Sequence, residues 1–465
     1  MYIFDSVKKT KLPFEPIHEG EASIYVCGPT VYDDAHLGHA RSSLAFDLLS
    51  RTLKALGYKV TLAKNFTDID DKIIRKVEET GKNMQEITAY YIDRYLDEMA
   101  QLGVQRADIE PKATESMDAI KQMIQTLIDK DFAYTVSSGD VYFDTSKDSH
   151  YGEISHKVTD DDTQSRVAHS SEKRNPKDFA LWKACKGEED ICFDAPFSSG
   201  RPGWHIECSA MIEKYFDGKG PYSIDIHGGG ADLLFPHHEN EAAQSRCATG
   251  HELAKYWMHN GFVQIDGEKM SKSLGNSFFL KDALKVYDGE VLRYYLNSVH
   301  YRNDFNFNEE DLQTAKKRLD KVYRLKKRVL PGKASAVNKA FKQSLLDAMA
   351  DDLNISVALS VIDEMVAETN EKLDANPKDK ALKKETIANI AFIDTLLGFG
   401  GKEPFSYFQI GISEEEKNRI EALIEKRTEA KKAKDFAASD AIRDELTAMG
   451  ITIMDTADGT VWEKN

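Results

Sequence analysis

The chain has 465 residues, of which 41% are hydrophobic and 30% are charged, and its net charge is −16. This composition is ordinary for a folded globular protein, and the negative balance does not announce a nucleic-acid binder. No apolar run approaches the roughly 20 residues of a membrane-spanning helix, which excludes an integral membrane protein of that kind. The N-terminal segment has no apolar core of a secretory signal, so we expect a cytoplasmic protein of several domains.

The N-terminal region has the pattern of a β-α-β unit. Residues 21–28 are apolar and β-branched and end in a glycine, which predicts a short buried strand. Leucines then recur at helical spacing between 37 and 56, and residues 58–70 form a second strand with its exit loop. Strand, helix and strand in this order predict the opening of a parallel, doubly wound α/β sheet.

The middle of the chain interrupts this rhythm. A helix is expected over 116–130 and a hairpin over 133–145, and the irregular pattern continues to about residue 200. We interpret this segment as an insertion. The pattern strand, glycine-rich loop, helix returns over 222–248, and another strand follows over 260–267.

The C-terminal part is predicted to be mainly helical. The helical segments are 309–330, 338–369, 376–398 and 413–449, and a small hairpin is expected over 450–462. Residues 316–333 contain nine lysines and arginines and a single aspartate, so the net charge of this segment is +8. A second basic cluster lies between 426 and 434. Taken alone, either run is most simply a solvated helix face.

Two short motifs point to nucleotide chemistry. His36-Leu37-Gly38-His39 stands between the first strand and the first long helix, where open α/β sheets bind phosphates. Gly38 would let a nucleotide approach the backbone, and two imidazoles three residues apart can face the same phosphates. Lys269 and Lys272 of the later segment KMSKS could neutralise a departing pyrophosphate.

The cysteines and histidines suggest a metal site. The candidate ligands are Cys27 at the end of the first strand, Cys208, and a histidine and a carboxylate of the segment PHHENE. His237 is four residues from Glu241 and so shares a helical face with it, and His238 is nearly as well placed. Because no CxxC pair is present, packed thiols beside a surface helix would also explain the pattern.

These motifs together resemble a known family. HLGH and KMSKS resemble the paired signatures of class I aminoacyl-tRNA synthetases. CGPTVY, GWHIECSAM and HGGGADLLFPHHENE resemble the cysteinyl-tRNA synthetases of bacterial type, and the resemblance covers essentially the whole chain. It implies a Rossmann-type catalytic domain with an inserted connective subdomain, a mainly α-helical C-terminal half and a small α+β end. It also implies ATP-dependent activation of L-cysteine and transfer of the cysteinyl group to tRNA(Cys).

The resemblance assigns roles residue by residue. It implies one Zn²⁺ per chain, which selects the substrate thiol, on Cys27, Cys208, His237 and Glu241. It implies ATP with Mg²⁺ as substrate, bound by His36, Gly38, His39, Gly230, Asp232, Lys269 and Lys272, of which His36, His39, Lys269 and Lys272 are catalytic. Thr67, Trp204 and His227 would line the cysteine pocket, whereas Cys185, Cys192 and Cys247 stay ordinary thiols.

The resemblance also divides the chain. The expected parts are 1–115 and 201–295 as the two halves of the catalytic domain, 116–200 as the connective insertion, 296–335 as a stem-contact region, 336–400 as a helical bundle and 401–465 as an anticodon-binding domain. The basic helix at 316–333 would contact tRNA phosphates. Trp462 is a candidate for stacking on an anticodon base, and the alternative is that it packs in the core. No editing domain is evident, and we expect a monomer.

Two other functions remain open from the sequence. A cysteine ligase of thiol biosynthesis could use the same core and zinc site but needs no anticodon domain, which the residues from 400 onward argue against. A non-catalytic, zinc-stabilised RNA-binding relative of the synthetases would have no use for both HLGH and KMSKS.

Overall fold

The computed structural model describes residues 1–156, 172–187, 190–265, 278–330, 332–456 and 459–464, and the backbone of Glu268 and Lys269. These residues form two compact units. The first comprises Met1–Lys281, Leu296–Asn308 and Leu345–Ala358, and the second comprises Asp282–Tyr295, Glu309–Ser344 and Leu359–Asn465. Among the described residues, no helix has both the length and the apolarity to cross a membrane.

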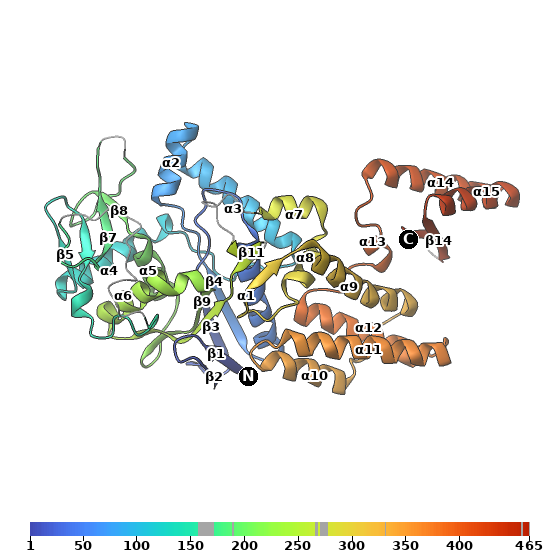
Figure 1. Ribbon diagram of the computed structural model, residues 1–465, viewed down its shortest axis with the longest axis horizontal. Coiled ribbons are helices and arrows are strands. Elements are labelled where there is room, and N and C mark those ends of the chain that lie inside the picture. Colours follow the sequence, from blue (N-terminus) through green and yellow to red (C-terminus); the bar gives the residue numbers. More distant parts are fainter. Residues whose placement is uncertain are drawn as a thin grey trace. The chain divides into compact units, whose positions relative to one another are not determined.

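A four-stranded parallel sheet is the centre of the first unit (Figure 1). Its order is β10 (Glu252–Asn260), β9 (Tyr222–Gly230), β3 (Glu21–Val26) and β4 (Lys59–Lys64). Helix α1 (Leu37–Ala55) connects β3 to β4, which is the predicted β-α-β unit. The parallel sheet and the order of its elements confirm the Rossmann-type prediction.

The sequence of β3 explains its central place. Ile24, Tyr25 and Val26 are all fully buried, as expected for a parallel strand that is covered on both faces. Helix α1 contacts β4, β9 and β10, while α5 (Trp204–Tyr215) contacts β9 and α6 (Glu239–Thr249) contacts β10. The strand order reverses between β3 and β9, and ligands of such sheets bind at the carboxyl ends of the strands beside that point.

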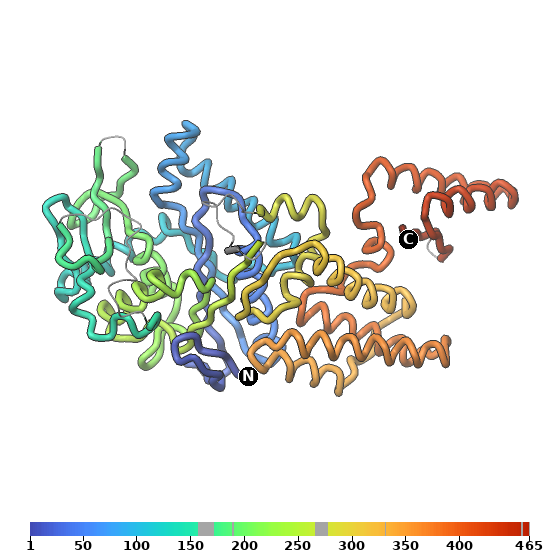
Figure 2. The backbone as a smooth tube through the Cα atoms, in the orientation of Figure 1, coloured from blue at the N-terminus to red at the C-terminus, as the bar shows by residue number. Residues whose placement is uncertain are grey.

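The predicted insertion forms a small antiparallel sheet of its own. Its strands are β5 (Ala133–Thr135), β6 (Val141–Phe143), β7 (Phe179–Ala184) and β8 (Gly200–Pro202), in that order. Helix α4 (Met117–Asp129) packs with α5 and α6, and Trp182, Phe143 and Ile124 are at the centre of this shared core. Figure 2 shows the chain leaving the sheet after α3 (Met84–Gln101) and returning through α5 to β9.

The prediction that Cys185 and Cys192 are ordinary thiols is wrong, because the structure joins them in a disulfide. The reason is local chain geometry. The N–H of Cys185 donates to the carbonyl of Ser199 (3.0 Å), and Phe193 and Gly200 are paired across the same turn. This pairing brings the two cysteine Cα atoms to 6.1 Å, within bridging distance. Cys247 is a buried free thiol, as expected.

The first unit also holds smaller elements around the sheet. These are the hairpin β1 (Tyr2–Asp5) and β2 (Thr10–Pro13), helix α2 (Asp71–Thr80), and the sheet β12 (Glu268–Lys269), β11 (Val263–Ile265) and β13 (Phe305–Phe307). Helix α7 (Leu280–Val286) begins in this unit, and its first residues pair with the chain just before α1. The described polypeptide on either side of the KMSKS segment is therefore part of the first unit.

The second unit is helical and ends in a small α+β part. Its helices are α8 (Gly289–Leu296), α9 (Glu309–Val329), α11 (Ile355–Ala375), α12 (Lys380–Leu397), α13 (Pro404–Tyr407), α14 (Glu414–Lys432) and α15 (Phe436–Ala448), some extending past the unit's edges. Helix α9 contacts α12, and Arg328 of α9 bonds to Asn370 of α11 (2.6 Å), so the three helices run side by side (Figure 2). The last strands, β14 (Ile451–Thr456) and β15 (Gly459–Lys464), form the expected hairpin.

Two predicted helices are each divided in two. The segment 338–369 contains α10 (Lys339–Ala350) and α11, separated by Asp352 and Leu353 with φ of 57° and 55°. Asp352 is held there because its buried carboxylate accepts hydrogen bonds from the N–H of Phe4 (2.9 Å) and the hydroxyl of Tyr301 (2.7 Å). The segment 413–449 breaks between α14 and α15 at Lys434, which also has positive φ.

Candidate functional site

Four chain segments bring the predicted metal ligands together. Cys27 directly follows β3, and its N–H donates to the carbonyl of Gly228 in β9 (3.2 Å). Cys208 lies on α5, and Glu241 lies in the first turn of α6. His237 is in the π-helical turn Leu234–His238, which runs directly into α6. The ligand atoms of all four residues lie within 4.8 Å of one another.

The distances around the Cys208 sulfur fit a tetrahedral ion. The two sulfurs are 3.8 Å apart, and two thiolates at zinc–sulfur distance in tetrahedral arrangement would be separated by about 3.8 Å. Cys208 Sγ lies 3.8 Å from His237 Nε2, and Cys27 Sγ lies 3.4 Å from Glu241 Oε1. His237 Nε2 and Glu241 Oε1 are 2.6 Å apart, the distance of a direct ion pair.

The electrostatics of the cluster favour a thiolate at Cys208. Burial acts to raise the pKa of this thiol, but the hydrogen bond from Cys27 and the neighbouring His237 outweigh it, and the pKa falls to about 7. At Glu241 burial also acts to raise the pKa, but His237 and His227 hold it well below its ordinary value. A buried, deprotonated sulfur beside a buried carboxylate is a strong donor set for a divalent cation.

A second set of donors overlaps the first. Cys27, His227, His238 and Glu241 also lie within 4.8 Å of one another. In this set His238 Nδ1 is bonded to His259 Nε2 (2.8 Å), and burial lowers the pKa of both rings, so they stay neutral. His237, by contrast, is the histidine that lies beside Cys208. The geometry thus separates the two histidines that spacing alone could not.

Side chains outside the predicted set support His237. His205 Nδ1 is 2.8 Å from His237 Nδ1, and burial lowers the pKa of His205 well below its ordinary value, so the neutral ring can accept a hydrogen bond from the Nδ1–H of His237. The ring of Trp204 stacks on His237 with centroids 3.9 Å apart. Histidine ligands commonly donate their second N–H in this way. The sequence around His205 is an ordinary helical pattern. It gives no sign of the hydrogen bond to His237, which is 32 residues away.

The three residues predicted to bind cysteine surround the cluster. His227 Nε2 is 4.0 Å from Cys27 Sγ, and Trp204 remains 38% exposed, so its ring is not part of the core. Thr67 is buried, and it pairs through its backbone with residues 29–31, just after Cys27. Its hydroxyl donates to Glu207 Oε2 (3.2 Å). The sequence analysis missed Glu207, whose carboxylate is buried beside Cys208.

Gly28 is where the chain passes closest to its neighbour. Its N–H donates to Asn65 Oδ1 (2.8 Å), and a Cβ at this position would lie 1.7 Å from the Asn65 carbonyl oxygen. Only glycine allows the two backbones to meet here. The loop after β4, which carries Thr67, is thereby held against the loop after β3.

The HLGH residues form their own cap on α1. The N–H of Gly38 donates to His36 Nδ1 (3.1 Å), and the N–H of His36 donates to His39 Nδ1 (3.2 Å). The rings stack with centroids 3.8 Å apart. Because each Nδ1 accepts a hydrogen bond, a neutral ring carries its proton on Nε2. Both imidazoles therefore present an N–H donor at the start of a helix, where anions bind.

The remaining predicted nucleotide residues are placed unequally. Gly230 ends β9, and Asp232 is exposed in the following short helix Ala231–Leu233. Lys269 contributes only backbone to β12, and Lys272 lies outside the described residues. The structure therefore brings His36, Gly38 and His39 together and leaves the two lysine side chains undescribed.

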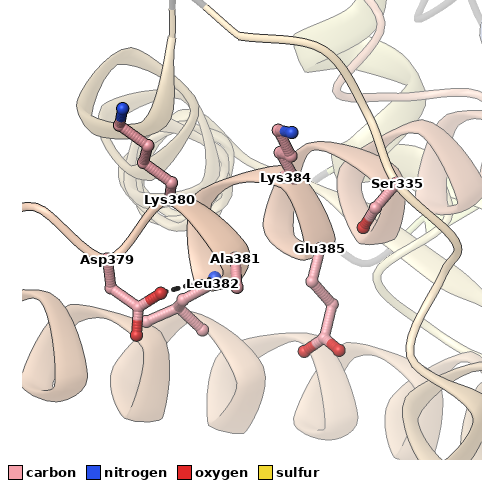
Figure 3. Close-up of a pocket in the computed structure, with 7 residues that line it drawn as sticks. All are labelled: Ser335, Asp379, Lys380, Ala381, Leu382, Lys384 and Glu385. Atoms are coloured by element: carbon pink, nitrogen blue, oxygen red, sulfur yellow. Dashed lines mark hydrogen bonds between the residues drawn. The ribbon is translucent and has the colours of Figure 1, made fainter.

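A cavity of about 680 Å³ lies elsewhere, within the second unit (Figure 3). It is lined by Ser335 and by Asp379, Lys380, Ala381, Leu382, Lys384 and Glu385 of the α12 N-terminus. The carboxylate of Asp379 caps α12 by accepting from the N–H of Leu382 (2.9 Å). With neither cysteine nor histidine in its lining, this cavity does not offer the chemistry of the cluster.

Three family models match the chain. Residues 13–317 match the tRNA synthetases class I (C) catalytic domain, 345–399 match the DALR domain, and 414–462 match the cysteinyl-tRNA ligase anticodon binding domain. The chain is 88% identical over 464 residues to the cysteine--tRNA ligase of a Sulfurovum species, and 65% identical over 467 residues to that of a Nitratiruptor species. Both matches cover the full length of both chains.

The fold is also shared with solved structures. Mycobacterium tuberculosis methionyl-tRNA synthetase in complex with methionyl-adenylate superimposes with a TM-score of 0.59. The match covers 81% of this chain and 92% of that chain at 15% identity. At this level of identity the similarity describes the fold alone.

Proposed function

The chain belongs to the cysteine--tRNA ligase family of class I synthetases, and from this premise we propose that it activates L-cysteine with ATP and transfers the cysteinyl group to tRNA(Cys). The observation that carries the proposal is the buried cluster of two cysteines, a histidine and a glutamate at the switch point of the sheet. Its Cys27 directly follows β3, and the loop after Cys27 leads to the HLGH turn. Amino-acid selection and activation would then occur at neighbouring ends of the same loop.

Cys27, Cys208, His237 and Glu241 would hold one zinc ion per chain. The sulfur–sulfur distance and the depressed pKa of Cys208 support this set over the one built on His227 and His238. A zinc ion there would bind a substrate thiolate far more tightly than a serine hydroxyl, a distinction that an apolar pocket cannot make strongly. Thr67, Trp204 and His227 would orient the bound amino acid.

His36 and His39 would donate hydrogen bonds from their Nε2–H groups to the phosphates of ATP. The stacked, hydrogen-bonded geometry supports this role, because donors that are already oriented need no reorganisation as charge develops. Gly38 would admit the nucleotide to the helix N-terminus, with Gly230 and Asp232 near the ribose. Lys269 and Lys272, with Mg²⁺ on the phosphates, complete the proposal from the family resemblance.

The cationic side chains of the basic helix α9 are of two kinds. Some of its cations hold the second unit together: Arg318 binds Asp363 (2.5 Å), Lys326 donates to the Gly400 carbonyl (2.7 Å), and Lys327 binds Glu463. Lys317, Lys321 and Arg324 are exposed. Within the described part of the chain, no hydrogen bond or ion pair joins their side chains to another residue. We call these three residues the basic stripe.

The basic stripe is the better candidate for a tRNA contact than α9 as a whole. Its residues are spaced by four and three, so they share one face of the helix. Free exposed cations can bind phosphates without first breaking an internal ion pair, and such contacts add affinity without base specificity.

The small C-terminal part would read unpaired bases of the anticodon. Trp462 is only 4% exposed and packs with Ile420, Leu446 and Ile451, so its core role holds and it is not the stacking residue. Phe436, at the start of α15, is 65% exposed. Lys434 lies two residues before it in the sequence, and a free aromatic face beside cations suits base stacking. We propose Phe436 for this contact.

The predicted domain boundaries carry over as proposals with this function. They are the catalytic halves 1–115 and 201–295, the insertion 116–200, the stem-contact region 296–335, the bundle 336–400 and the anticodon-binding domain 401–465. A tRNA-charging enzyme of this kind would act as a monomer in the cytoplasm.

Charging of tRNA(Cys) with cysteine is the experiment that tests the function. Cysteine-dependent ATP–pyrophosphate exchange together with cysteinyl-tRNA formation is expected. A cysteine ligase of thiol biosynthesis would show exchange without charging, and a non-catalytic binding protein would show neither. The match of 414–462 to an anticodon-binding model favours the first outcome. Unchanged discrimination between cysteine and serine after zinc removal would contradict the role of the metal.

A further inference from the structure

Asp34 lies two residues before the HLGH turn and holds two cations. Its Oδ1 is 2.9 Å from Arg94 Nε of α3, and its Oδ2 binds the Nζ of Lys281 at the start of α7. The Asp34 side chain is only 9% exposed. A nearly buried carboxylate held by two cations from distant parts of the chain is a strongly determined contact.

The backbone reinforces the same junction. The N–H of Leu280 donates to the carbonyl of Ala35 (2.8 Å), and the N–H of Leu37 donates to the carbonyl of Phe278 (3.3 Å). His36 and Phe279 form the antiparallel bridge between these bonds. Residues 35–37 and 278–280 are therefore joined by one antiparallel bridge, with His36 and Phe279 at its centre and the Asp34–Lys281 ion pair next to it.

A further carboxylate adjusts the charge of the junction. Glu98 is buried one helical turn from Arg94, 3.6 Å from its guanidinium, and burial raises the Glu98 pKa to about 7. Asp34 is the carboxylate that contacts both Arg94 and Lys281. Removing its charge would break both ion pairs and release one end of the pairing.

We propose that Asp34 is a positioning residue of the ATP site, which pins residues 278–281 to residues 34–37 and so fixes the direction of the His36 and His39 rings. The proposal rests on the proposed adenylation function. Asp34 does not touch the reacting atoms in this assignment, and it acts through the backbone of Ala35 and His36. The cysteine-selecting cluster includes neither Asp34 nor Lys281, so it is independent of this junction.

The test compares Asp34→Asn and Lys281→Met with the wild-type chain in cysteine-dependent ATP–pyrophosphate exchange. Each variant is expected to raise the KM for ATP about tenfold and to lower kcat, while the KM for cysteine and the zinc content stay within about twofold of wild type. The double variant should lose little more than Asp34→Asn alone, because that variant already removes the ion pair with Lys281. Lys281 is exposed enough to vary without emptying a core site.

Lys285→Met is the matched control. Lys285 lies on the same helix and forms an exposed ion pair with Asp282 (2.7 Å), so its loss should leave both KM values unchanged. Unchanged KM for ATP in Asp34→Asn and Lys281→Met would overturn the proposal, as would equal increases in the KM for ATP and cysteine. Absence of exchange in the wild-type chain would instead refute the proposed function itself, so the two failures are distinguishable.

Discussion

The cysteine cluster and the histidine turn stand on one loop but are built in opposite ways. Cys27 acquires its neighbours from α5, the π turn and α6, which are separated from it by 181 to 214 residues of sequence. His36 and His39 are oriented by backbone N–H groups no more than three residues away. A site made of distant side chains depends on the whole sheet, whereas the histidine turn is capped by its own residues and is joined to distant chain only through its pairing with residues 278–281. The two should therefore fail separately.

Loss of a cluster ligand should have the largest effect. Cys208→Ala is expected to remove the zinc and to lower kcat/KM for cysteine in pyrophosphate exchange by about a thousandfold or more, because a buried carboxylate and histidine lose their counter-ion. Metal analysis and exchange kinetics measure the effect. Cys247→Ala is the matched control, a buried thiol outside the cluster that should keep the metal. Full zinc content in Cys208→Ala would contradict the assigned ligand set.

Loss of the histidine turn should spare the metal. The double variant His36→Ala/His39→Ala is expected to lower kcat for adenylation by about a hundred- to a thousandfold, since two oriented donors are lost. The zinc content should remain at one per chain. If the metal were lost together with activity, the division of the loop between metal and nucleotide would be wrong.

The basic stripe should affect only the second half-reaction. Lys317→Glu/Lys321→Glu is expected to raise the KM for tRNA about tenfold, and to reduce the slope of log affinity against log salt by about two. Adenylation without tRNA should not change. Lys378→Glu, an exposed lysine between α11 and α12, is the control. A loss of adenylation in the stripe variant would show that these lysines are structural.

Glu98 should give the smallest effect, on stability rather than rate. Its pKa in the folded chain, about 7, lies above the ordinary value of 4.5. The stability that protonated Glu98 contributes is therefore complete below about pH 4.5 and is lost as the pH rises to about 7. Glu98→Gln should show a smaller fall in Tm between pH 5 and pH 8 than the wild-type chain. Equal falls in the two chains would argue against the raised pKa.

The same contrast explains what could be predicted from the sequence. The strand before Cys27, the helix after Gly38 and the insertion are local patterns, and the parallel sheet follows from their order. The proposed choice of His237 over His238 is not local, because it rests on where α5 places Cys208. The break at Asp352 was missed because its cause is a hydrogen bond to Phe4, 348 residues away. The Cys185–Cys192 disulfide was missed because it depends on the pairing of Phe193 with Gly200.

The close passage at Gly28 has a consequence for how the enzyme could be altered. Because residue 28 has no side chain, the loop that begins at Cys27 lies directly against the loop that carries Thr67. Any side chain there would have to push these two loops apart, although position 28 is itself neither a predicted ligand nor a signature residue. Gly28→Ala, the smallest such change, would test whether separating the two loops lets the enzyme accept a longer thiol substrate.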